Sequence, residues 1–251
     1  MNEQRFACTA CGLCCYGMLP LSIEEALKWA DTFPLAMSAT PLKPGTRGYA
    51  TKDVAVTFSA RAKKPIQLIV TPVAFIPPAT PCPKLADNSL CMIHEEKPQR
   101  CRTMPFYAYK NEDSQRDMLV PRPGWKCATS DDAPVVYRDR QIVDRAEFQR
   151  ERDLLQGQSS VLQRYVDTLG RYDPGFSIRV QKAAKAAVPG RVIVGFVSWL
   201  RQNKELDVLD FARRQYPVLR KWFEKTSGDP RAAQFTSYYG EAMRDLDRYL
   251  A

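Results

Sequence analysis

Phe6-Ala7-Cys8-Thr9-Ala10-Cys11-Gly12-Leu13-Cys14-Cys15 is the stretch around which we expect the chain to be organised, because it places four thiols within one or two turns of chain. Four more cysteines follow, and none lies beyond the last of them: Cys82, Cys91, Cys101 and Cys127. Such clustering near one end is typical of a thiolate-ligated metal centre. We therefore predict that all eight cysteines are metal ligands.

The spacing of the first three cysteines is informative. Cys8, Cys11 and Cys14 follow C-x2-C-x2-C, which is also the spacing of the first three ligands in bacterial ferredoxin runs. Gly12 tolerates the positive φ that a chain curling around a centre requires. Cys15 departs from the ferredoxin run, because it is adjacent to Cys14 instead of three residues further on.

Consecutive cysteines do not suit one ion, since the side chains of Cys14 and Cys15 point in different directions. They suit two adjacent centres, or one ligand and one free thiol. Eight thiols suffice for two four-cysteine sites, or for one iron–sulfur cluster and one zinc ion. The spacing alone does not partition them.

Other interpretations of the thiols remain open. A lone cysteine is commonly a small buried hydrophobic residue, and Cys127 is the best candidate for that role. A redox disulfide is the main competitor for the N-terminal group, since C-x2-C is also a thioredoxin-type spacing. His94 is the single histidine and could join Cys91 in a zinc site, although a supporting or surface role is favoured. We find no phosphate loop and no dinucleotide fingerprint.

Composition narrows the class of protein. With 251 residues, 45% hydrophobic and 26% charged, the chain resembles an ordinary globular protein. Its net charge of +9 is spread among acidic residues, so solvated helix faces are favoured over a specific nucleic-acid surface. No stretch predicts a membrane span or a signal peptide, and we expect a cytoplasmic protein. In that reducing compartment, clustered cysteines are commonly metal ligands or catalytic thiols.

Patterning predicts an α+β fold, with a metal-binding domain of short strands and loops over residues 1–143. Ser22-Ile23-Glu24-Glu25 is a capping box that predicts a helix to about Phe33. Residues 34–48 are expected to form a loop, and residues 54–59 and 65–75 to form two antiparallel strands. Proline-rich residues 76–83 should hold Cys82 in an extended segment. A hairpin is expected over residues 135–143.

Residues 144–251 are predicted to form a helical region that packs on the first domain. One helical pattern starts at Asp144 and is interrupted at Gly157. A second helix is expected from Pro189, with Val192, Ile193, Phe196 and Leu200 buried. A third should open at Asp207 and be kinked or split by Pro217, and a fourth should open at Asp229-Pro230.

The combined cysteine motif resembles a known family. The motif is Phe6-x-Cys8-x2-Cys11-Gly12-x-Cys14-Cys15, then Cys82, then Cys91-Met92-Ile93-His94-x2-Lys97-Pro98-x2-Cys101-Arg102-x2-Pro105. It resembles the YkgJ-type cysteine-cluster family, whose members are described as zinc- or iron-chelating and often as iron–sulfur-cluster containing. Lys97, Met104 and His94 depart mildly from the family pattern. The resemblance covers about residues 6–106 and implies metal binding, but no particular reaction.

Three functions follow as hypotheses. The preferred one is an iron–sulfur protein, for example with a 4Fe–4S cluster, used in electron transfer or sensing, with a second metal as an option. The second is a structural zinc or iron site beside a protein-interaction module. The third is a protein-modifying enzyme, because flagellin lysine methylases have a similar cysteine cluster. Whether the chain is an enzyme, and which protein it contacts, stay open.

Overall fold

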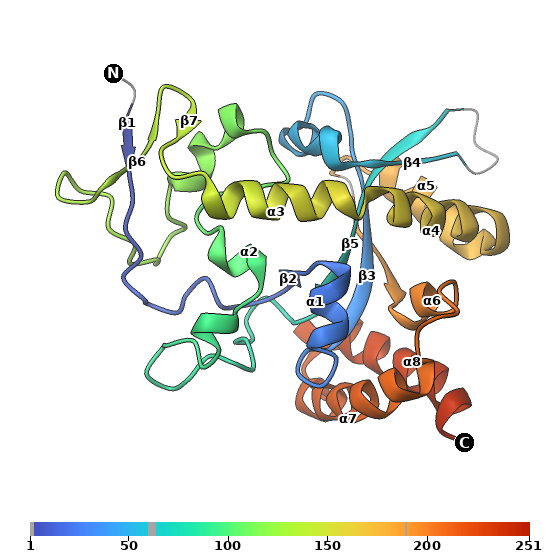
Figure 1. Ribbon diagram of the computed structural model, residues 1–251. Coiled ribbons are helices and arrows are strands. Elements are labelled where there is room, and N and C mark those ends of the chain that lie inside the picture. Colours follow the sequence, from blue (N-terminus) through green and yellow to red (C-terminus); the bar gives the residue numbers. More distant parts are fainter. Residues whose placement is uncertain (1–2, 60–63, 189) are drawn as a thin grey trace.

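The computed structural model describes residues 3–59, 64–188 and 190–251, and it has the predicted α+β class (Figure 1). Within these residues, a five-stranded antiparallel sheet has the order β2-β5-β3-β8, with β4 paired to β5. Its strands are β2 (Leu19–Pro20), β3 (Leu35–Pro41), β4 (Val56–Phe58), β5 (Ile66–Ala74) and β8 (Val192–Gly195).

Strand β3 lies at the centre of this sheet, although its residues were expected to form a loop. It pairs with β5 from Leu35 opposite Ala74 to Pro41 opposite Leu68, and it pairs with β8 on its other edge. The prolines that suggested a loop, Pro34 and Pro41, lie at the two ends of the strand, where a missing backbone donor is tolerated. Most of the residues of β3 are buried, as expected of a central strand.

Strand β8 corrects a second expectation. Residues 192–195 were assigned to a helix starting at Pro189, which itself lies outside the described residues. They instead form an edge strand antiparallel to β3, with Ala36 opposite Gly195. The run Val-Ile-Val is β-branched and suits a strand better than a helix. Only the short helix α6 (Val197–Leu200) follows it.

The first helix, α1 (Ile23–Lys28), confirms the predicted capping box. The Glu25 amide donates to Ser22 Oγ at 3.1 Å, and the Ser22 amide donates to Glu25 Oε2 at 2.8 Å. The helix is shorter than expected, because it ends at Lys28 and turns follow as far as Phe33.

The C-terminal region is mostly helical, as predicted. Gly157 ends α3, and the chain restarts at once as α4. Asp207 caps α7, but Pro217 lies inside this helix without splitting it. A helix that was not predicted, α5, begins at Pro174 and is capped by Asp173. The helices are α3 (Ala146–Gly157), α4 (Ser159–Tyr172), α5 (Pro174–Lys185), α7 (Val208–Thr226) and α8 (Ala233–Leu250), which follows the 3-10 turn η5 (Pro230–Ala232).

A smaller antiparallel sheet of order β1-β6-β7 lies beside the cysteine loops (Figure 1). It consists of β1 (Glu3–Arg5), β6 (Val135–Arg138) and β7 (Gln141–Ile142), which confirms the predicted hairpin. Asp139 and Arg140 adopt positive φ values of 48° and 68° in its turn. Between β1 and β6, outside the larger sheet, the chain forms α2 (Gln99–Arg102) and short 3-10 helices. These are η1 (Arg47–Val54), η2 (His94–Glu96), η3 (Glu112–Ser114) and η4 (Arg116–Leu119).

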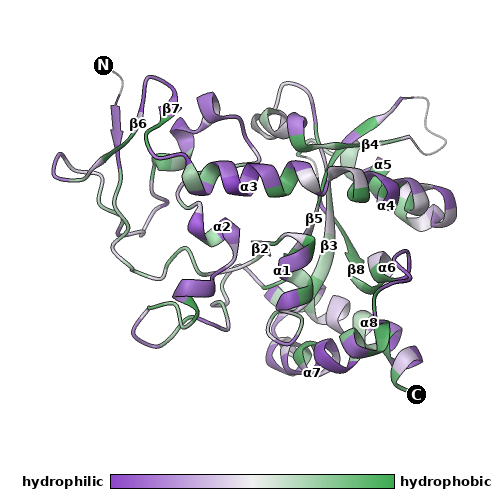
Figure 2. Ribbon diagram, in the orientation of Figure 1, coloured by the Kyte–Doolittle hydropathy of each residue, from purple (hydrophilic) through white to green (hydrophobic). Residues whose placement is uncertain are grey.

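Two hydrophobic clusters support these sheets. The larger one joins residues 21–76 to residues 162–246, and the smaller one joins Phe6, Phe106 and Tyr137 to Phe148 and Leu155 of α3. Figure 2 shows the corresponding hydrophobic colouring along β5 and β8. Both clusters contain side chains from residues 1–143 and from residues 144–251. The division of the chain into two domains at residue 143 stays a prediction. No helix in the described ranges is long and apolar enough to cross a bilayer.

One buried amide joins the C-terminal helices to the central strand. Gln215 of α7 accepts from the Leu35 amide at 2.6 Å and donates to the Phe33 carbonyl at 3.0 Å and to the Ala30 carbonyl. Its side chain is 1% exposed. It therefore satisfies the amide at the start of β3 and two carbonyls of the turns that precede this strand.

We expect Gln215→Leu to lower the free energy of unfolding by at least about 1–3 kcal/mol, because it leaves buried backbone groups unpaired. Urea unfolding would measure the loss. Gln156→Leu, on an exposed position of α3, is the matched control and should change stability by less than about 0.5 kcal/mol. Equal effects of the two substitutions would contradict this role for Gln215.

Candidate metal centre

The N-terminal cysteine loop curls tightly between β1 and β2. Ala10 and Gly12 have positive φ values of 52° and 72°. The Cys15 amide donates to the Gly12 carbonyl at 2.9 Å, and the Ala10 amide lies 3.4 Å from Cys8 Sγ. The predicted positive φ at Gly12 is thus confirmed, and an amide points at a thiol sulfur in this curl.

The start of this loop is held beside the last cysteine. Ala7 and Ala128 form an isolated antiparallel bridge with hydrogen bonds of 2.8 and 3.0 Å. Two residues beyond Ala7, the Thr9 hydroxyl donates to the Lys126 carbonyl at 2.9 Å. In this antiparallel register, Cys8 lies opposite Cys127.

The end of the loop is held beside the middle cysteines. Tyr16 and Pro81 form a second isolated bridge, and the Cys82 amide donates to the Cys15 carbonyl at 2.7 Å. Cys82 therefore lies opposite Cys15, in the extended proline-rich segment that the sequence predicted. A third bridge, between Leu85 and Cys91, turns the chain back toward Cys82.

Gly12 also packs closely on this second loop. A Cβ atom at Gly12 would lie 3.1 Å from both the Cβ and the carbonyl oxygen of Ser89, and 3.2 Å from Leu85 Cδ1. Only a residue without a side chain allows this approach at that positive φ. The two cysteine loops are thereby brought into contact.

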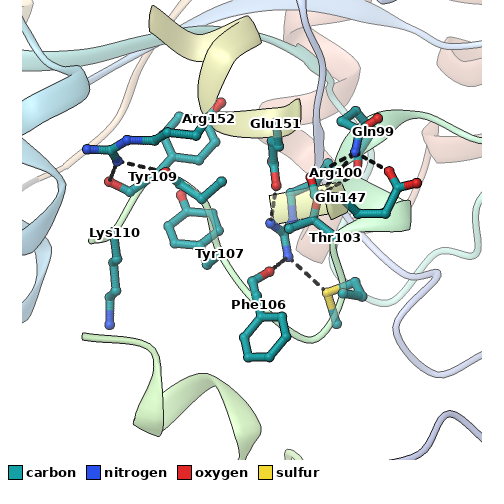
Figure 3. Close-up of polar contacts among 12 residues, drawn as sticks. Gln99, Arg100, Thr103, Phe106, Tyr107, Tyr109, Lys110, Glu147, Glu151 and Arg152 are labelled. Atoms are coloured by element: carbon teal, nitrogen blue, oxygen red, sulfur yellow. Dashed lines mark hydrogen bonds and ion pairs between the residues drawn. The ribbon is translucent and has the colours of Figure 1, made fainter. Parts of the chain in front are cut away.

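Cys101 comes from α2, and hydrogen bonds attach this short helix to α3 (Figure 3). Gln99 Nε2 donates to Glu147 Oε2 at 2.6 Å and to the Glu147 carbonyl at 3.0 Å. Thr103 Oγ1 donates to the same carbonyl at 3.2 Å. The position of Cys101 is therefore fixed by residues of the C-terminal region.

A buried ion pair strengthens this attachment (Figure 3). Arg100 Nη1 lies 2.9 Å from Glu151 Oε2, with side-chain exposures of 9% and 5%. The guanidinium also donates to the Phe106 carbonyl and lies 5.1 Å from the Tyr107 ring centroid. Burial raises the pKa of Glu151, and Arg100 opposes that shift by favouring the carboxylate. The sequence analysis missed this pair, for which the only signal was an arginine adjoining a cysteine.

Neighbouring thiols shift one another's protonation. The adjacent Cys15 sulfur raises the pKa of Cys14, and Cys14 in turn lowers the pKa of Cys15. Burial raises the pKa of Cys101 to about 12, and the thiols of Cys82, Cys14 and Cys91 act in the same direction.

The pKa values of Cys11 and Cys127 are shifted as well. Backbone hydrogen bonds at Leu13 and Lys126 lower the pKa of Cys11. Burial raises the pKa of Cys127, followed by the thiols of Cys11, Cys8 and Cys14. Every predicted cysteine therefore lies close to at least one other predicted cysteine.

The donor set fits a thiophilic metal or cluster by its chemistry. All eight cysteines are free thiols, and each is exposed or only partly buried, unlike the core cysteines of most proteins. Across the part of the chain that the structure describes, no three histidine, cysteine or acidic side chains are arranged to hold one ion. The backbone thus gathers the thiols, and their side chains are not oriented toward one common point.

His94 lies exposed on η2, in keeping with the expected surface role.

Comparison with protein families identifies this region. Residues 7–121 match the CxxCxxCC family, described as a putative zinc- or iron-chelating domain. The match confirms the cysteine-cluster resemblance over these residues. It ends before Cys127 and excludes helices α3 to α8. No curated protein and no solved structure matches the chain.

We expect Gly12→Ala to lower thermal stability, because alanine at positive φ costs about 1–2 kcal/mol and its Cβ would meet Ser89. Gly124→Ala is the matched control: its φ is +87°, but nothing lies within 4 Å of the added Cβ. Chemical denaturation of both variants would compare the costs. A cost at Gly12 no larger than the cost at Gly124 would refute the close approach of the two loops.

We expect Arg100→Met to lower the free energy of unfolding by about 3–5 kcal/mol, because it leaves the buried Glu151 carboxylate without its partner. Arg220→Met breaks the exposed Arg220–Glu224 pair and should cost no more than about 1 kcal/mol. Urea unfolding at neutral pH would measure both values. A small loss for Arg100→Met would show that the pair does not anchor α2.

Proposed function

We propose that the chain binds an iron–sulfur cluster through its cysteines and uses it for electron transfer or sensing. One observation carries this proposal: backbone bridges join the loops of seven free thiols, and the attachment of α2 to α3 positions the eighth, Cys101. Thiolate-only ligation and the C-x2-C-x2-C spacing are typical of such clusters. The chelating-domain family of residues 7–121 supports iron as well as zinc.

The protein would hold, orient and partly shield such a group. In the N-terminal loop the Ala10 amide points at Cys8 Sγ, and the Arg100–Glu151 pair keeps α2, with Cys101, against α3. A bound cluster would supply one-electron redox chemistry. Cys8 and Cys14 are exposed, so a redox partner protein could approach this side of the centre. We place the protein in the reducing cytoplasm, where eight free thiols would persist.

A structural zinc site is the second candidate, and the same family match favours it equally. Zinc held by four cysteines is closed and non-catalytic, and its binding energy contributes to folding. In that case the helical region would be an interaction module. The lysine-methylase hypothesis rests on the sequence resemblance and stays a prediction.

Metal and sulfide analysis of anaerobically purified protein tests the proposal. We expect iron with acid-labile sulfide and a visible charge-transfer band that bleaches on reduction. Cys15→Ser should lower iron content and solubility together, because metal binding and folding are coupled. His94→Ala should leave the iron content unchanged. Zinc alone, in colourless protein, would overturn the cluster and favour the structural site.

A further inference from the structure

We propose that the exposed face of α5 docks the protein on an anionic lipid surface. This inference goes beyond the proposed function and does not depend on metal binding, because α5 carries no cysteine. Figure 1 places α5 at the opposite side of the molecule from β1 and β6, beside which the cysteine loops lie. The α5 surface consists of Ile178, Arg179, Lys182 and Lys185, with Tyr172 and Val188 just beyond the two ends of the helix.

Positive charge is concentrated around α5. Residues 174–204 contain six basic residues and no acidic residue, so the interspersed signs expected of the helical region are absent here. Lys182 and Lys185 are exposed in the last turn of α5. Among the described residues, the only ion pair that α5 makes joins Arg179 to Asp173 across 4.0 Å. The charges of the two lysines are therefore not compensated by an ion pair.

Helical spacing places these lysines on one face with an apolar side chain. Ile178, Lys182 and Lys185 follow the i, i+4, i+7 spacing of a single helix face, and Ile178 is 67% exposed. The opposite face holds Phe176 and Val180, which are fully buried where α5 packs against β3 and β8. One face of α5 is thus anchored in the core, and the other is uncovered.

Exposed apolar side chains also flank the helix. Tyr172, at the end of α4, is 73% exposed, and Val188, beyond the end of α5, is 81% exposed. The Arg171 guanidinium lies 5.9 Å from the Tyr172 ring centroid. Apolar side chains among basic ones suit a membrane interface, where the apolar groups enter the boundary of the acyl chains and the cations stay among the headgroups.

The size and chemistry of the α5 surface favour lipid over other acidic partners. The 12 residues of α5 span about 18 Å and present a strip roughly 10 Å wide, far less than the roughly 800 Å² that a stable protein partner covers. Lipid binding has no such minimum, because charged and apolar contributions add residue by residue. A nucleic acid would offer phosphates to the lysines but no apolar medium to Ile178 and Val188. The cytoplasmic leaflet is anionic, in agreement with the location proposed above.

Flotation with vesicles of equal parts phosphatidylglycerol and phosphatidylcholine tests the proposal on the full chain under reducing conditions. We expect binding at low ionic strength that weakens as salt is added, and no binding to phosphatidylcholine alone. Lys182→Gln combined with Lys185→Gln should weaken binding about 20–30-fold, because each lysine near anionic lipid contributes about fivefold.

The matched control is Lys221→Gln combined with Lys225→Gln, which removes two exposed charges from α7. It should bind vesicles within about threefold of the parent protein, because its charges lie outside the contact and are screened. Absence of vesicle binding at low ionic strength, or equal losses in the two double variants, would overturn the proposal.

Ile178→Ser separates lipid from nucleic acid. We expect it to weaken vesicle binding about fivefold, because the side chain loses its apolar contact with the membrane. A fluorescent DNA duplex provides the comparison. Binding to the duplex but not to vesicles, lost with the two lysines and unchanged in Ile178→Ser, would replace the membrane by a nucleic acid and overturn the proposal. Metal content, measured on the same samples, reports on the proposed function separately.

Discussion

The candidate site depends on two isolated backbone bridges, one at each end of the N-terminal cysteine loop. Ala7–Ala128 and Tyr16–Pro81 each join segments more than sixty residues apart. Without them, the eight thiols would belong to unconnected loops with no reason to meet. The bridges need no side-chain chemistry, so the cysteines between them remain free for ligation.

The helical region takes part in the site through α2. Gln99 and Arg100 precede Cys101 directly, and their partners Glu147 and Glu151 lie one turn apart on α3. Ordering the Cys101 segment therefore requires that α3 be folded. Ligation of metal by Cys101, as proposed, would order the same segment from the other side, and the two processes would then stabilise each other.

Local chemistry made several features predictable from sequence. The Ser22–Glu25 capping box, the hairpin at Asp139-Arg140 and the helix break at Gly157 each depend on neighbouring residues. By contrast, β3 was mistaken for a loop because its flanking prolines resemble turn signals, while its identity depends on pairing with β5 and β8. For the site, the eight cysteines can be named as candidate ligands from their spacing alone, and their role as ligands stays a prediction. Which cysteines face each other depends on the register of bridges between distant segments, which no local pattern contains.

Strand β8 has a consequence for the order of events during synthesis. Residues 192–195 complete one edge of a sheet whose other strands lie within residues 19–74. A chain made from its N-terminus presents every cysteine before that edge strand leaves the ribosome, because the last thiol is Cys127. Pairing of such distant segments is slow compared with local folding. Metal binding by these thiols, as proposed, would therefore be able to precede closure of the main sheet in the nascent chain.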